Sequence, residues 1–86
     1  MSSCVDLHLT KDEAIVLFEF FARFQESEPC RLRIANNAEF VALSRISAQL
    51  DKALVEPFDT RYVELLEEAR ERIAAGYEGL APGVEP

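Results

Sequence analysis

The chain is poor in the residues that most often build catalytic and metal centres. Of its 86 residues, one is histidine, two are cysteine, three are glycine and none is tryptophan. All three glycines lie near the C-terminal end, which excludes a glycine-rich phosphate-binding loop. Two cysteines are too few for a secreted disulfide framework, and they form no Cys-x-x-Cys pair for zinc. We therefore expect no cofactor, no metal and no enzymatic activity.

One catalytic alternative stays open at this point. Cys4, His8 and Cys30 would converge if the segments that carry them were neighbours, and a nucleophilic enzyme needs a thiol held beside a base. We expect instead that these residues have no catalytic role: His8 is exposed, both cysteines are reduced, and Cys30 is buried. A disulfide between Cys4 and Cys30 is the less favoured arrangement.

Long uncharged runs and basic residues are also scarce. No uncharged run exceeds six residues, so no segment is long enough to span a membrane. The N-terminus lacks the basic start and apolar stretch of a secretory signal. Nine Lys and Arg stand against sixteen Asp and Glu, a net charge of −7, which disfavours nucleic acid because affinity for a polyanion comes chiefly from basic contacts. These features predict a small acidic cytoplasmic protein that binds neither membrane nor nucleic acid.

Two short segments alternate apolar and polar residues with period two. They are residues 5–9, Val-Asp-Leu-His-Leu, and residues 30–34, Cys-Arg-Leu-Arg-Ile. This alternation is typical of a half-buried strand. It predicts a strand on either side of the first helix, and a right-handed βαβ unit if the strands are parallel neighbours. Whether they pair within one chain or between two chains is left open.

The first helix has clear boundaries in the sequence. Thr10 and Glu13 have the spacing of a capping box, and Pro29 limits the helix to about residue 26. A surface helix needs an apolar stripe of about 100°, whereas residues 11–26 are apolar around most of the circumference. This helix is therefore predicted to be central in the fold or partly buried by a second chain.

A second and a third helix follow. Asn36 or Asn37 is predicted to cap the second helix, and Pro57 ends it. Asp59 is predicted to cap the third helix, with Phe58 packed on Val63 as a hydrophobic staple. The residues that this third helix is predicted to turn inward are Tyr62, Leu65, Leu66, Ala69 and Ile73.

Together these elements predict a mostly helical α+β fold. A short strand, a helix and a second short strand are followed by a two-helix hairpin. Residues 1–76 form a single small domain, in which Gly76 stops the third helix. Residues 77–86, rich in glycine and proline, form a flexible C-terminal tail.

Two sets of side chains are candidates for binding another molecule. The third helix carries more acid than base, and its predicted internal pairs are Glu67 with Arg70 and Glu68 with Arg72. The candidate protein-binding residues of this acidic face are Asp59, Glu64, Glu67, Glu68 and Glu71. Six phenylalanines exceed what one small core can easily enclose. Phe18 and Phe20 point to different sides of the first helix and are the candidates for self-association.

Two stretches resemble short, uncharacterised acidic bacterial proteins. They are residues 9–14, Leu-Thr-Lys-Asp-Glu-Ala, with residues 18–20, Phe-Glu-Phe, and residues 53–58, Ala-Leu-Val-Glu-Pro-Phe. The resemblance covers about residues 5–75 and implies a free-standing bacterial domain. It implies no activity, because its motifs are capping and turn residues.

Small size, acidity and missing catalytic residues favour a non-catalytic protein-binding module. The first hypothesis is an inhibitor or immunity-type protein whose acidic face neutralises a basic partner, with Phe or Tyr side chains as anchors. The alternative is a self-associating, homodimeric structural or accessory subunit with no activity of its own. An enzyme that uses His8 and a cysteine is the third and least favoured hypothesis.

Overall fold

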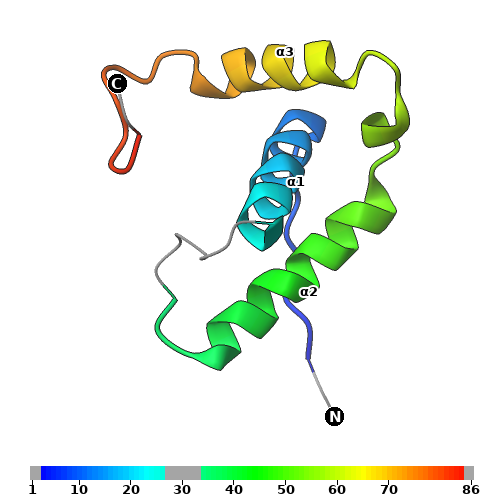
Figure 1. Ribbon diagram of the computed structural model, residues 1–86, viewed down its shortest axis with the longest axis vertical. Helices are drawn as coiled ribbons and strands as arrows, with labels where there is room; N and C mark the ends of the chain where they lie inside the picture. Colours follow the sequence, from blue (N-terminus) through cyan, green and yellow to red (C-terminus); the bar gives the residue numbers. More distant parts are fainter. Residues whose placement is uncertain (1–2, 27–33, 85–86) are drawn as a thin grey trace.

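The fold consists of three helices arranged around the first of them. The computed structural model describes residues 3–26 and 34–84. These form α1 (Lys11–Glu26), α2 (Asn37–Ala53) and α3 (Tyr62–Ala74), with a short 3-10 turn, η1 (Glu56–Phe58), between α2 and α3. α1 packs against both of the other helices, which spread from η1 as two arms around it (Figure 1). Of the two predicted alternatives, a central first helix is the one that the single chain shows.

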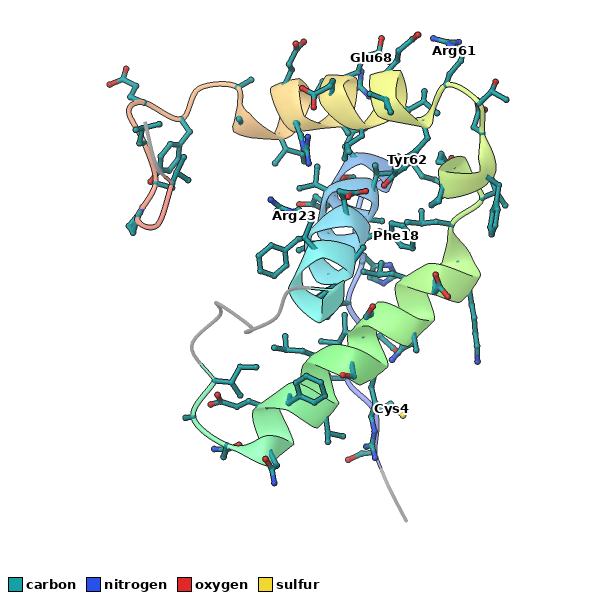
Figure 2. The ribbon with its side chains drawn as sticks, viewed as in Figure 1. Cys4, Phe18, Arg23, Arg61, Tyr62 and Glu68 are labelled. Carbon is teal, nitrogen blue, oxygen red and sulfur yellow. The ribbon has the colours of Figure 1, made fainter. Side chains whose placement is uncertain are left out.

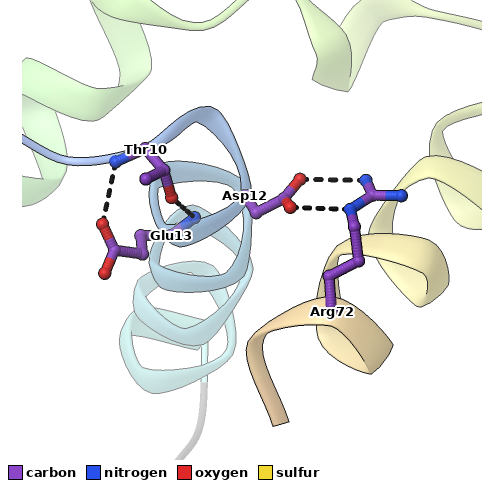
Figure 3. Close-up of polar contacts among 4 residues, drawn as sticks. All are labelled: Thr10, Asp12, Glu13 and Arg72. Atoms are coloured by element: carbon purple, nitrogen blue, oxygen red, sulfur yellow. Dashed lines mark hydrogen bonds and ion pairs between the residues drawn. The ribbon is translucent and has the colours of Figure 1, made fainter. Parts of the chain in front are cut away.

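The helix boundaries follow local capping residues. The Thr10 amide donates to Glu13 Oε1 at 2.8 Å, and the Glu13 amide donates to Thr10 Oγ1 at 3.1 Å (Figure 3). This is the predicted capping box. Asn36 caps α2 by accepting a hydrogen bond from the Glu39 amide at 3.0 Å. Gly76 follows the end of α3 with a φ of +87°, a conformation that glycine adopts without a Cβ clash.

The predicted α+β fold is wrong: the regular elements of the described residues are all helices, and these residues contain no strand. Residues 5–9 form neither helix nor strand, and Val5 and Leu7 are 88% and 78% exposed. A strand is stabilised by hydrogen bonds to a neighbouring strand, and the described part of the chain offers this segment no such neighbour. Of the second predicted strand, residues 30–33 lie outside the described residues, and Ile34 is in no strand.

The predicted two-helix hairpin and its hydrophobic staple are also wrong. α2 and α3 diverge from η1 instead of packing side by side (Figure 1). Asp59 does not cap a helix directly but accepts a hydrogen bond from the Arg61 amide at 2.7 Å, and α3 begins only at Tyr62. Val63 is therefore the second residue of α3, not the fourth position that a staple requires. Phe58 and Val63 remain 86% and 73% exposed.

The core that these helices enclose is small. Its buried side chains are Ile15, Phe21, Leu50, Leu54, Leu66 and Ala69. The chain exposes 7469 Å², whereas a folded monomer of this mass exposes about 5,100 Å². The radius of gyration is 14.5 Å, against about 12 Å for a compact domain of this length. The arrangement is open, and Ile73, predicted to be inward, is among the exposed apolar residues.

No described helix combines the length and the hydrophobicity needed to cross a bilayer. The division into a domain of residues 1–76 and a flexible tail of residues 77–86 stays a prediction.

Candidate functional site

One side of α3 packs on α1, and the other carries the predicted acidic face. Leu66 and Ala69 are buried with Ile15 of α1 and with Leu54, so the intervening positions of α3 face solvent. Figure 2 shows Glu68 and Arg61 on the outer side of α3, with Tyr62 toward α1. All the predicted acidic-face residues are exposed: Asp59, Glu64, Glu67, Glu68 and Glu71.

Two arginines partly neutralise this face. Arg61 Nε lies 3.3 Å from Glu64 Oε2, and Arg70 Nη1 lies 2.6 Å from Glu67 Oε1. The second pair was predicted and is confirmed. Exposed pairs of this kind contribute at most about 1 kcal/mol to stability, so their main effect here is on the charge of the surface. Five carboxylates remain against two arginines.

Arg72 does not form the predicted pair with Glu68. It turns toward α1 and donates two hydrogen bonds to Asp12, from Nε at 2.7 Å and from Nη2 at 2.9 Å (Figure 3). These bonds lower the pKa of Asp12 below its usual value. Sixty residues separate the two partners, so no local spacing indicates this contact. As a result, Glu68 and Glu71 form no hydrogen bond or close ion pair within the part of the chain that the structure describes, although both carboxylates are near enough to Arg72 to help raise its pKa.

A second contact missed by the sequence joins α1 to the start of α3. The Tyr62 hydroxyl donates to Glu19 Oε1 at 2.9 Å. The Tyr62 ring stands edge-on to Phe18, with 6.4 Å between centroids and 88° between planes. Burial of the phenol, and then its hydrogen bond to the carboxylate, raise the pKa of Tyr62 to about 12.

We expect this contact to make stability sensitive to alkaline pH. The folded state favours the neutral phenol, whose pKa in an unfolded chain is about 10. The contribution of the neutral Tyr62 phenol to the free energy of unfolding is therefore complete below pH 10. It is lost as the pH rises through the folded pKa of about 12. Urea unfolding measured from pH 9 to 12 should show a falling free energy of unfolding. Tyr62→Phe should flatten this fall, whereas Tyr77→Phe, at an exposed tyrosine, should leave it in place. Equal curves for both variants would contradict the assignment.

The two candidate self-association residues lie on α1 in different surroundings. Phe18 is half-buried and packs against the core cluster as well as Tyr62. Phe20 is half-buried beside Phe21, with 5.6 Å between ring centroids, and the Arg23 guanidinium lies 6.0 Å from its ring. The role of Phe18 and Phe20 in self-association stays a prediction.

The residues of the catalytic alternative are only partly described. Cys4 is an exposed free thiol and His8 is exposed, while Cys30 lies outside the described residues. Among the described residues, no group of three His, Cys, Asp or Glu side chains is placed to hold a metal ion.

No known protein family, curated protein or solved structure matches this chain. The resemblance to short acidic bacterial proteins stays a prediction.

Proposed function

We propose that this chain is a non-catalytic protein-binding module that recognises a basic protein through the outer face of α3. The observation that carries the proposal is the excess of exposed carboxylates on this face, where Arg72 forms its hydrogen bonds with Asp12 of α1 instead of with Glu68. Such a surface attracts a positively charged partner and speeds its encounter. An inhibitor or immunity-type protein that covers a basic substrate cleft fits this chemistry.

Apolar anchors flank the acidic face. Phe58 in η1 precedes it, and Val63 in α3 lies one turn before Glu67 on the same side of the helix. Both side chains are largely exposed. A few large apolar side chains surrounded by polar residues supply most of the energy in protein interfaces. The acidic face therefore combines carboxylates that attract a basic partner with apolar side chains that can bind it.

Charge reversal on α3 tests this function. Glu68→Lys/Glu71→Lys breaks no internal ion pair and should reduce capture of the partner from a lysate. With the captured partner purified, the variant should bind it at least about tenfold more slowly at low salt and with a weaker salt dependence. The measurement is the association rate by surface plasmon resonance over a series of salt concentrations.

The matched control is Asp51→Lys/Glu78→Lys. It makes the same change in net charge at exposed positions on α2 and after α3. It should retain the wild-type rate apart from a small effect of overall charge. If the two double variants slow association equally, net charge rather than the α3 face is responsible, and the proposed site is wrong.

Self-association is the second candidate function, favoured by a separate observation. The exposed area exceeds that of a compact monomer by about 2,300 Å², and large apolar side chains such as Val5, Leu7 and Phe58 are among the exposed residues. A homodimeric structural or accessory subunit would bury part of this surface. The two functions are compatible, because a dimer can still present α3 to another protein.

A further inference from the structure

An apolar groove lies between the N-terminal segment and α2. Its volume is about 620 Å³. The segment contributes Val5, Leu7 and Leu9 to its lining, and α2 contributes Ile46 and Leu50. Apart from Leu50, these side chains are exposed in the single chain. Asp6, Lys11 and Gln49 also line the groove. Exposed apolar side chains that gather in one place and are rimmed by polar residues are typical of an interaction site.

The chain as a whole exposes enough area to supply an interface with a second copy around the groove. A standard interface takes about 800 Å² from each partner. The excess over a compact monomer, about 2,300 Å², is more than one such contribution. Burying the groove against its copy would bring the exposed area of each chain closer to that of an ordinary folded protein.

The sequence of the N-terminal segment is complementary to itself in one direction. If two copies lie antiparallel and are centred on Leu7, Val5 faces Leu9, Asp6 faces His8, and Leu7 faces its own copy. The imidazole can donate a hydrogen bond to the carboxylate. A parallel arrangement in register would instead place Asp6 against Asp6, and like charges directly opposite are destabilising.

We infer that a second copy of this chain covers the groove, with residues 5–9 of the two copies antiparallel about a twofold axis at Leu7. Each chain keeps its three helices, and the apolar side chains of both segments pack over α2. The inference rests on the self-associating candidate function and is independent of the acidic face, because no residue of α3 lines the groove.

Cysteine cross-linking tests the proposed register. In a Cys4→Ser/Cys30→Ser background, Leu7→Cys should form a disulfide-linked dimer under mild oxidation. Val5→Cys should form it at least about tenfold more slowly, because four extended residues, about 13 Å, separate Val5 from its copy, beyond the roughly 7 Å that a disulfide spans between Cα atoms. A mixture of Val5→Cys and Leu9→Cys proteins should cross-link. Equal rates for Leu7→Cys and Val5→Cys would overturn the register.

The solution mass measured by light scattering tests the same interface without introduced cysteines. The wild type should have about twice the 9.7 kDa mass of the chain, Leu7→Asp should have the monomer mass, and the control Val63→Asp should remain a dimer. A wild type that stays monomeric at high concentration overturns both this inference and self-association, and leaves the acidic face standing. A Leu7→Asp protein that stays dimeric overturns this interface alone. In that case Phe18→Asp and Phe20→Asp show whether α1 mediates self-association.

Discussion

Leu66→Ala is expected to lower the free energy of unfolding by about 2–5 kcal/mol, the usual cost of truncating a buried leucine. Leu66 is 7% exposed and belongs to the cluster that joins α3 to Ile15 and Leu54. A domain of this length has a total stability of roughly 4–13 kcal/mol. With so few buried side chains to compensate, the variant should be marginally stable. Urea unfolding followed by far-ultraviolet circular dichroism measures the difference.

The matched control is Val63→Ala, three residues earlier in the same helix. Val63 is exposed, so its truncation should change the free energy of unfolding by no more than about 0.5 kcal/mol. A cost below 1 kcal/mol for Leu66→Ala, or equal costs for the two variants, would show that α3 does not pack on α1 through Leu66.

Ala69→Leu is expected to destabilise the protein by adding volume where no space exists. Ala69 is completely inaccessible in the core cluster with Ile15 and Leu66. A larger side chain there must push α3 away from α1 or adopt a strained rotamer, at a cost of about 1–3 kcal/mol. The measurement is the midpoint of urea unfolding together with the slope of the transition.

Ala74→Leu is the control for this substitution. Ala74 ends α3 and is exposed, so the added side chain meets solvent and the unfolding midpoint should stay close to that of the wild type. An Ala69→Leu protein as stable as the wild type would mean that α1 and α3 can separate without cost. That result would contradict the close packing of α3 on α1 at Ala69.

Features that depend on nearby residues could be predicted from the sequence. The Thr10–Glu13 capping box, the Asn36 cap of α2 and the stop at Gly76 each depend on residues within one turn of each other. The acidic face of α3 follows in the same way, because helical spacing places its carboxylates on the side opposite Leu66 and Ala69. All these features are fixed by local geometry.

The strand prediction failed because alternation alone does not provide a partner for pairing. Residues 5–9 have the period of a strand, but a strand forms only where another backbone satisfies its hydrogen bonds. In the single chain the described residues offer none to this segment. The staple between Phe58 and Val63 failed because α3 begins at Tyr62, two residues later than a cap at Asp59 would start it.

The sequence by itself determined where α1 and α2 begin, where α3 stops, which side of α3 is acidic, and the scarcity of residues for catalysis. It did not determine the end of α2 at Ala53 or the start of α3 at Tyr62. Only the tertiary structure decided which charged side chains of α3 are paired with α1 and which contacts join the two helices. The pairing of Arg72 with Asp12 and of Tyr62 with Glu19 joins residues more than forty positions apart. Such contacts depend on how α3 crosses α1, which is set by the packing of Leu66 and Ala69 rather than by any local spacing.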